Sequence, residues 1–137
     1  IQAVVANYKL KKKLNNITKK RIKNALLFDQ VFKKNSNVQT VERLNYYKEV
    51  FHLYHINVNK RDKLQKYLIK NGVDAKVHYP IPIHLQTAAK YLRYKRGDFP
   101  VAEKMASTSM SLPVHEFIKE KDIKNVASLI ENFYKKN

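Results

Sequence analysis

The sequence predicts a small two-layer α+β domain, in which about three strands carry flanking helices and a long N-terminal helix leads into the domain. Its 137 residues suffice for one hydrophobic core. Hydrophobic residues make up 44% of the composition, so the chain can fold although it has no cysteine for disulfides. Helical periodicity at both ends encloses a central region rich in β-forming residues.

The first predicted element is a helix over residues 1–34. Apolar residues recur there at steps of three and four, and lysines occupy the other face. Asn35, Ser36 and Asn37 supply the turn chemistry at which this helix ends. A helix of that length exceeds the needs of a small domain, so we expect it to bend or to bridge two bodies.

The middle of the chain predicts strands around one helix. A short strand is expected over residues 38–41, and VFHLYHINV, residues 50–58, reads as a central strand that is apolar on both faces. Asn59 is expected to cap a helix that ends at Gly72. With a further strand over 73–79, the order strand, helix, strand predicts one α/β crossover and leaves the strand order open.

The last part of the chain predicts loop and helix. Pro80 and Pro82 end the preceding strand because neither residue can donate a ladder hydrogen bond. A short helix is expected over 86–92, and Pro100 suits the first position of a helix that reaches Ser111. The final helix, residues 119–134, has one apolar face formed by Ile123, Val126, Ala127, Ile130, Phe133 and Tyr134.

The chain is strongly basic, with a net charge of +17 and a pI near 10.0. A basic surface is typical of phosphate binding, so a stand-alone nucleic-acid-binding module is one alternative. Against it, the excess is mostly lysine scattered through every segment, with few of the arginines that make bidentate contacts. A low-GC coding bias gives the same composition, and we therefore expect no nucleic-acid partner.

Nothing in the sequence resembles a targeting or membrane segment. The apolar runs are far shorter than a bilayer span, and the first residues lack the order of a signal peptide. We therefore expect a cytoplasmic protein without a membrane partner. The chain starts at Ile1, inside a predicted helix, which suggests a piece of a longer protein.

The common catalytic and metal-binding patterns are weak here. His52 and His55 lie three apart on a predicted strand and point to opposite faces, and no carboxylate lies between His78 and His84. The serines of residues 107–115 lie near a histidine without a strained nucleophile turn. With only two glycines there is no phosphate loop either. We therefore predict no catalytic, cofactor-binding or metal-ligating residue.

The segment VHYPIPIHL, residues 77–85, is the candidate binding element. It follows a predicted strand, where ligand sites of α/β sheets often gather. Alternating prolines stiffen it and reduce the entropy lost when His78 and Tyr79 meet a ligand. The alternative is a proline-rich connection whose rings only cap the core, and the residues by themselves favour neither.

Four segments resemble the DegT/DnrJ/EryC1/StrS family of sugar aminotransferases, which are pyridoxal-phosphate enzymes of the aspartate-aminotransferase fold. They are IQAVVANYKLK at the start, FHLYHINV, VHYPIPIHLQ with KYLRYKRGDFPVAEKMASTSMSLPVH, and a terminal helix ending IENFY. The specific part is residues 78–115, where HYPxPxH, GDFPxAE and SLPxH follow the family's order.

The resemblance implies a domain plan and a site. Residues 1–34 would be an inter-domain helix and residues 35–137 the C-terminal small domain, while an absent large domain would hold pyridoxal 5'-phosphate and its Schiff-base lysine. His78, Tyr79 and His84 are then expected to bind the nucleotide-sugar substrate, and this fragment alone would be inactive.

For the full-length protein, the resemblance implies a homodimer that transfers an amino group from an amino acid, commonly glutamate, to a keto-sugar nucleotide for polysaccharide or related glycan synthesis. A sugar dehydratase and a regulator built on the same fold are the alternatives within the family.

Overall fold

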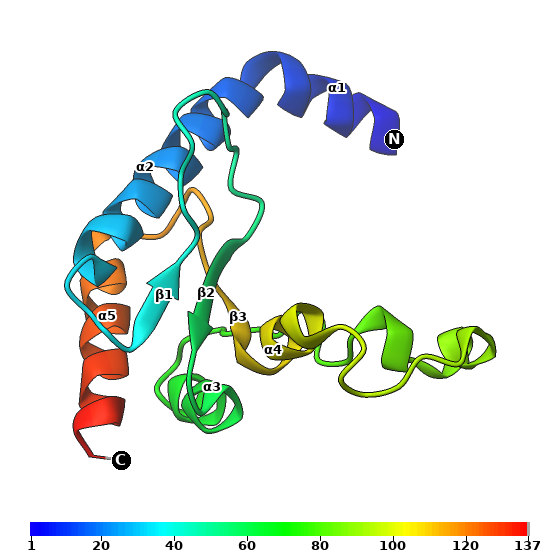
Figure 1. Ribbon diagram of the computed structural model, residues 1–137. Coiled ribbons are helices and arrows are strands. Elements are labelled where there is room, and N and C mark those ends of the chain that lie inside the picture. Colours follow the sequence, from blue (N-terminus) through cyan, green and yellow to red (C-terminus); the bar gives the residue numbers. More distant parts are fainter. Residues whose placement is uncertain (137) are drawn as a thin grey trace.

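The computed structural model describes residues 1–136 and contains one three-stranded antiparallel sheet (Figure 1). The strands β1 (Val38–Thr40), β2 (Tyr54–Val58) and β3 (Ser109–Leu112) lie in the order β1, β2, β3. Val38 is opposite Val58, and Ile56 is opposite Met110. Helices flank this sheet, and a helix begins the chain, so the predicted fold class is confirmed.

The predicted N-terminal helix is present and bends. It consists of α1 (Gln2–Lys12) and α2 (Leu14–Phe32), separated at Lys13, whose φ of −121° and ψ of −28° depart from helical geometry. α2 buries Phe28 and Phe32, whereas α1 buries no residue. Figure 1 shows α1 projecting beyond the body of the domain.

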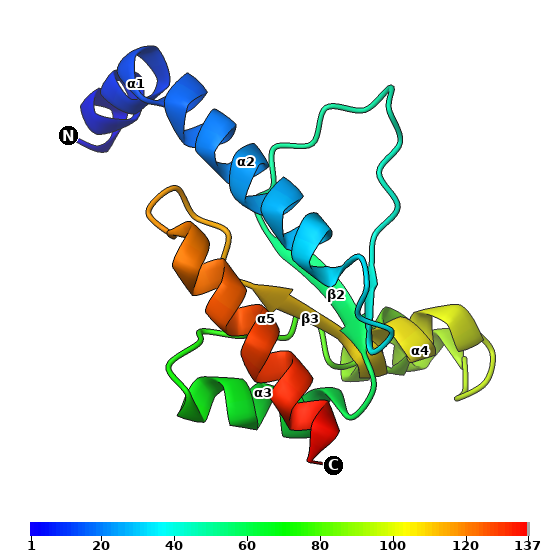
Figure 2. The same ribbon diagram turned by 90° about the vertical axis from the view of Figure 1, so that its left-hand side faces the viewer.

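The core lies between the sheet and the helices α2, α3 (Arg61–Lys70) and α5 (Glu120–Lys135). α5 packs against both α2 and α3 (Figure 2). Five residues of its predicted apolar face are buried, namely Ile123, Val126, Ala127, Ile130 and Phe133, and Tyr134 is half-buried. Asp122 accepts the backbone N–H of Lys119 at 3.0 Å and so fixes the start of α5.

The central strand is shorter than predicted. It begins at Tyr54, whereas residues 50–53 belong to the loop that follows β1. Phe51 has a φ of +52°, which interrupts extended backbone, and its carbonyl accepts a hydrogen bond from Arg21 at 3.1 Å. Residues 50–53 of the expected strand are therefore loop, and Arg21 of α2 holds this loop at Phe51.

The predicted strand over 73–79, and with it the α/β crossover, is wrong. The N–H of Ala75 donates to the carbonyl of Val73 at 2.8 Å, which closes a tight turn. Only Lys76 reaches the sheet: it donates its N–H to Ser111 O at 3.0 Å and accepts the Ser111 N–H at 2.7 Å. The third strand is instead β3, within the residues predicted as the end of a helix.

The boundaries of two further helices differ in part from the prediction. α4 (Pro100–Thr108) starts at Pro100 as expected but ends before Ser109, which is extended and opposite Asn57 of β2. The predicted cap at Asn59 is wrong, because Lys60, with a φ of +52°, precedes α3. The predicted stop of α3 at Gly72 is confirmed by a left-handed φ of +79° there.

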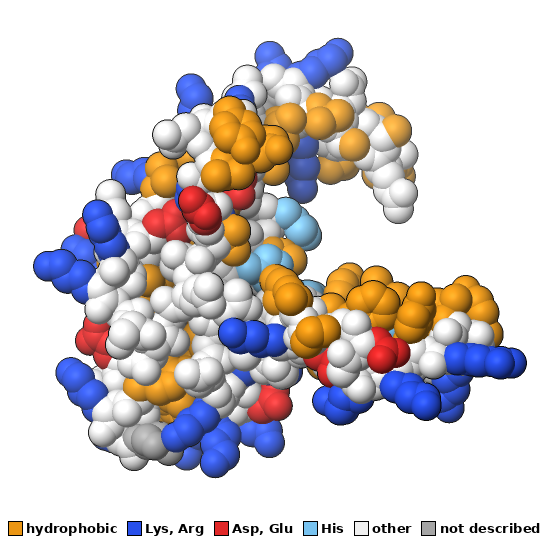
Figure 3. Space-filling view, in the orientation of Figure 1, with side chains coloured by type: hydrophobic (Ala, Val, Ile, Leu, Met, Phe, Trp, Pro, Cys, Tyr) orange, Lys and Arg blue, Asp and Glu red, His pale blue; other side chains and the backbone are white. Residues whose placement is uncertain are grey.

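Residues 80–108 project from the sheet as a second extension, which we call the arm. It contains 3₁₀ helices at Ile83–Leu85 and Thr87–Leu92, the second in place of the predicted helix over 86–92, and then α4. The arm and α1 enclose a deep concave side of the molecule, which we call the hollow (Figure 3).

Candidate functional site

The sheet face that looks away from the core helices carries polar side chains. Tyr54 and Ile56 of β2 are buried, while His55 between them is half-buried, so it points to the opposite face. His55 lies directly opposite Ser111 of β3. Lys76 pairs with Ser111 on the other side, and His78 follows two residues later on the same face. The sheet thus brings together two histidines that are distant in sequence.

A cavity of about 180 Å³ opens beside these residues. Its lining combines three histidines with one serine, two cations, one carboxylate and apolar residues: Arg21, His52, Leu53, Asp74, Lys76, His78, Ser111, Leu112, Pro113, Val114 and His115. Figure 3 shows pale-blue histidine side chains on the inner wall of the hollow, between the apolar surfaces of its two extensions. The cavity therefore offers histidine ring nitrogens to a polar ligand.

Ser111 links two of the histidines. Its Oγ lies 3.2 Å from Nδ1 of His78 and 3.2 Å from Nδ1 of His55. Only 3% of the Ser111 surface is exposed. Burial, and then the charge of His78, lowers the pKa of His55 below its ordinary value of 6.5. The neutral form of the His55 ring is therefore favoured.

The cations around the cavity already have partners. Arg21 donates to the carbonyl oxygens of Phe51 at 3.1 Å and His52 at 3.2 Å. Lys76 Nζ lies 3.3 Å from a carboxylate oxygen of Asp74. Arg21 thus holds the loop before β2 against α2 and shapes the wall of the cavity.

The predicted residues His78 and Tyr79 lie together, with ring centroids 6.0 Å apart in an edge-to-face arrangement. Tyr79 is 76% exposed, so its phenol is available to a ligand. His78 is half-buried and anchored by Ser111. The structure therefore presents one ring fixed by the sheet next to one that is open to solvent.

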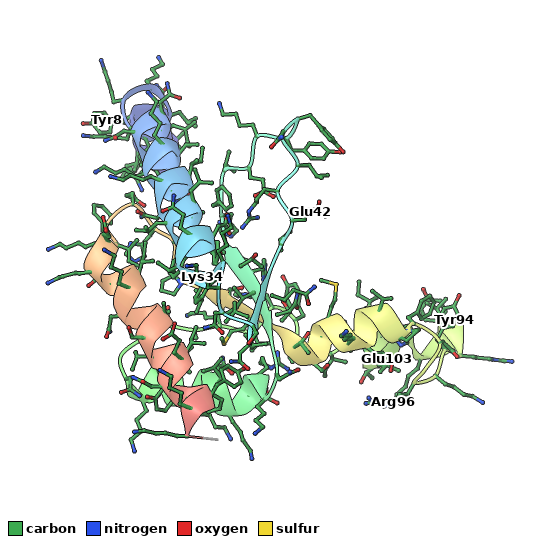
Figure 4. All side chains as sticks on the ribbon, turned by 60° about the vertical axis from the view of Figure 1, so that its left-hand side comes forward. Tyr8, Lys34, Glu42, Tyr94, Arg96 and Glu103 are labelled. Atoms are coloured by element: carbon green, nitrogen blue, oxygen red, sulfur yellow. The ribbon has the colours of Figure 1, made fainter. Side chains whose placement is uncertain are left out.

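The third predicted residue, His84, lies within the arm. Its Nε2 is 3.1 Å from Oε1 of Glu103, and its side chain is only 8% exposed. The ring also packs on Phe99, with centroids 4.8 Å apart. Oε1 of Glu103 additionally accepts the N–H of Gly97 at 2.7 Å. In Figure 4, Glu103 and Tyr94 both lie on this arm, so these contacts tie the HYPxPxH and GDFPxAE motifs together.

Sequence reasoning missed His55 and Ser111 as members of the cluster. The sequence predicts His55 on the central strand and Ser111 at the end of a helix, and neither position indicates a binding site. A usable signal existed for His55, because it alternates with the apolar residues Tyr54 and Ile56 and so faces away from the core. No local signal marks Ser111, because its strand geometry depends on pairing with distant residues.

The lining of this cavity does not fit a binding site for pyridoxal phosphate, the cofactor that the resemblance implies. Such a site needs an amine for the aldehyde of the cofactor and a cradle of backbone amides for its phosphate. The one lysine of the cavity, Lys76, is engaged by Asp74. Neither Gly72 nor Gly97 lines the cavity. We therefore assign this chain no covalent step with the cofactor.

Residues 1–136 contain neither a candidate metal site nor a candidate membrane span. No group of three or more histidine, aspartate or glutamate side chains in this range is placed to hold a metal ion. None of the helices in this range is both long and apolar enough to cross a bilayer.

Comparison with known proteins gives a family match over nearly the whole chain. The profile of the DegT/DnrJ/EryC1/StrS aminotransferase family matches residues 1–131. A pleiotropic regulatory protein of Geobacillus stearothermophilus is 43% identical over 86 residues, which cover 63% of this chain and 23% of that protein. A dTDP-3-amino-3,6-dideoxy-alpha-D-galactopyranose transaminase of Aneurinibacillus thermoaerophilus is 30% identical over 84 residues, 61% of this chain and 23% of that protein.

A solved structure shares the fold. DesV of S. venezuelae, in complex with a ketimine intermediate, superposes with a TM-score of 0.89 at 24% identity over 96% of this chain and 35% of DesV. The chain thus spans about a quarter of the length of the two curated relatives and about a third of DesV.

Proposed function

The chain belongs to the DegT/DnrJ/EryC1/StrS aminotransferase family, and from this premise we propose that the full-length protein transfers an amino group from an amino acid, glutamate, to a keto-sugar nucleotide. The name of the Aneurinibacillus thermoaerophilus relative, a transaminase of a dTDP-linked sugar, supports the nucleotide-sugar substrate. The ketimine in the DesV structure supports a pyridoxal-phosphate cofactor, which supplies an electron sink at the reacting carbon when bound. We place this activity in the cytosol, in polysaccharide or related glycan synthesis.

We assign residues 35–137 to the small domain of that enzyme and residues 1–34 to the helix that joins it to a large domain. The support is exposed apolar surface on both extensions. On α1, Val4 is 72% and Tyr8 56% exposed, and on the arm, Ile83 is 79% and Val101 73% exposed. Apolar surface on two facing extensions is typical of a docking surface. In our proposal the large domain covers it and binds the cofactor, and the whole protein is a homodimer.

The observation that carries the proposal is the contact of Tyr79 with His78, which lines the cavity. Imidazole and phenol groups both donate and accept hydrogen bonds, as the hydroxyls and phosphates of a sugar nucleotide require. His78 is anchored by Ser111 and Tyr79 is open to solvent. We propose that both contact the sugar nucleotide, whereas His84 belongs to the site by holding the arm through Glu103.

Substitution of His78 by alanine, or of Tyr79 by phenylalanine, tests this proposal in the full-length protein. We expect each change to lower kcat/KM for the sugar nucleotide about tenfold, because one hydrogen bond to the substrate is lost. The absorption spectrum of the bound cofactor should remain that of the wild type. Tyr46→Phe is the matched control, since Tyr46 is as exposed as Tyr79, at 76%, but does not line the cavity. Unchanged kcat/KM in both motif variants would contradict the assigned contacts.

The similarity to a pleiotropic regulatory protein supports a second candidate, a regulator built on the same fold. A sugar dehydratase is the other alternative within the family. The upstream residue at the Schiff-base position distinguishes them: lysine there supports the aminotransferase, whereas histidine supports the dehydratase. Salt-sensitive DNA binding by the full-length protein would favour the regulator.

A further inference from the structure

We propose that Ser111 is a positioning residue that fixes the proton of the His78 ring: Ser111 Oγ accepts the Nδ1–H of His78 and donates its own hydrogen to Nδ1 of His55. Nε2 of the neutral His78 ring then faces the ligand as a hydrogen-bond acceptor. The inference deepens the proposed function, because it rests on the contact of His78 with the sugar nucleotide.

The hydrogen-bonding capacity of the Ser111 hydroxyl couples the tautomers of the two rings. A hydroxyl has one hydrogen to donate and two lone pairs to accept with. Both partners of Oγ are ring nitrogens, Nδ1 of His55 and Nδ1 of His78, each at 3.2 Å. When both rings are neutral, the hydroxyl donates to one Nδ1 and accepts from the other, so the two rings carry opposite tautomers.

The position of the hydroxyl is fixed by the sheet. Ser111 lies opposite His55 in the ladder of β2 and β3. On its other side it exchanges two backbone hydrogen bonds with Lys76, at 2.7 and 3.0 Å. With 3% of its surface exposed, Ser111 has little access to water as a competing partner. Both histidines therefore form hydrogen bonds with one hydroxyl, whose position is fixed.

His78, Ser111 and His55 form a hydrogen-bond relay. The direction of its two hydrogen bonds follows from the protonation states of the two rings. Burial lowers the pKa of His55 and so favours its neutral ring. A cationic His78 donates from Nδ1, and the hydroxyl must then donate to His55. If the neutral pair has the same direction, His78 gains or loses its Nε2 proton without any rotation of the hydroxyl. The reverse direction would require that rotation at each protonation.

Other ionisable groups lie around the pair. On the His78 side, they line the cavity: Arg21, His52, Asp74, Lys76 and His115. On the His55 side, they line a neighbouring depression: Arg43, Lys48, Glu49 and His52. The nearest sequence neighbours, Asp74 and Lys76, form an ion pair with each other at 3.3 Å. Ser111 supplies the hydrogen-bonded connection between the two rings.

The test uses the full-length protein with ¹⁵N-labelled histidine, because ring ¹⁵N shifts report which nitrogen carries the proton. In the wild type we expect neutral His78 as the Nδ1–H tautomer and neutral His55 as the Nε2–H tautomer. In Ser111→Ala, His78 should change to the Nε2–H form that predominates in water. Ser111→Thr keeps a hydroxyl and should retain the wild-type pattern.

Two further variants separate the relay from general disturbance of the fold. His55→Phe leaves Ser111 intact but removes its acceptor, so the hydroxyl can donate to His78, whose neutral ring should become the Nε2–H form. His52→Gln is the control, because His52 lines the same cavity without a bond to Ser111. It should leave the His78 tautomer unchanged. An Nε2–H tautomer in the wild type, or no change in Ser111→Ala, would overturn the inference.

Activity measurements separate this inference from the proposed function. We expect Ser111→Ala to lower kcat/KM for the sugar nucleotide about tenfold and to change the shape of its pH profile, and Ser111→Thr to restore both. If the tautomer changes as expected while kcat/KM and its pH profile remain those of the wild type, the relay stands and the proposed contact of His78 with the sugar fails.

Discussion

Glu103 shows how one carboxylate joins three parts of the arm. Its Oε1 accepts the N–H of Gly97 at 2.7 Å and lies 3.1 Å from Nε2 of His84. The hydrogen bond from Gly97, and with it the one from His84, lowers the pKa of Glu103 below its ordinary 4.5. The ionised form is therefore the one that the folded arm favours.

The sign of the resulting pH dependence is fixed by that shift. Because folding lowers the pKa of Glu103, its contribution to the arm is fully present above pH 4.5 and is lost as the pH falls through the lowered value. The protection factors of amides in residues 83–105 of the full-length protein, which correct for the intrinsic exchange rate at each pH, should therefore fall on acidification within that window. Glu103→Gln should show faster exchange at neutral pH and no such acid step.

Glu120→Gln is the matched control for this prediction. Glu120 also has a lowered pKa, caused first by its hydrogen bond with Lys124, but it lies in the exposed first turn of α5. Exchange in the arm should be unaffected by that change. Equal acceleration in both variants would mean that the arm responds to overall charge and not to the contacts of Glu103.

At the scale of elements, the helices could be predicted from the sequence and one strand could not. The apolar face of α5 repeats every three to four residues, and those side chains are the ones that the core buries. β3 has four residues and directly follows α4, so it offers too little alternation to be recognised. Its extended geometry depends on β2, whose partner residues lie more than fifty positions earlier in the chain.

The candidate site was predictable to the same limited extent. The HYPxPxH motif indicated His78 and Tyr79 because prolines and aromatic rings are visible in a local window. The partners that fix His78 were not visible in this way, because Ser111 and His55 reach it only through the order of the strands. A site built across a sheet requires the register, and the register is a long-range property.

The packing of α5 gives the prediction at this scale. Ile130 of α5 is 0% exposed in the core. Ile130→Ala should therefore destabilise α5 by about 2–5 kcal/mol, because apolar burial is lost and a cavity remains. Native-state hydrogen exchange of the α5 amides measures this change. Ile69→Ala is the matched control, since Ile69 is 54% exposed on α3, and it should cost less than about 0.5 kcal/mol. Similar losses in both variants would contradict the assigned core.

Two extensions, α1 and the arm, project from the molecule, and they differ in the contacts that hold them. α2 packs on the core, but α1, its continuation beyond Lys13, buries no residue. The arm keeps its shape through local contacts, such as the hydrogen bond between His84 and Glu103. Both extensions present exposed apolar side chains toward the hollow in Figure 3. Their geometry is therefore suited to holding a second body between them.

Ile83 and Ile69 provide the test of that arrangement. In this chain, Ile83 of the arm is 79% exposed and Ile69 of α3 is 54% exposed. If the rest of the polypeptide covers the exposed apolar side chains of the arm, as proposed, hydroxyl-radical labelling of the full-length protein should modify Ile83 more slowly than Ile69, the reverse of the order set by this chain alone. The comparison uses one residue type, so intrinsic reactivity cancels. Faster labelling of Ile83 would show that the hollow stays open to solvent and would contradict the proposed position of the large domain.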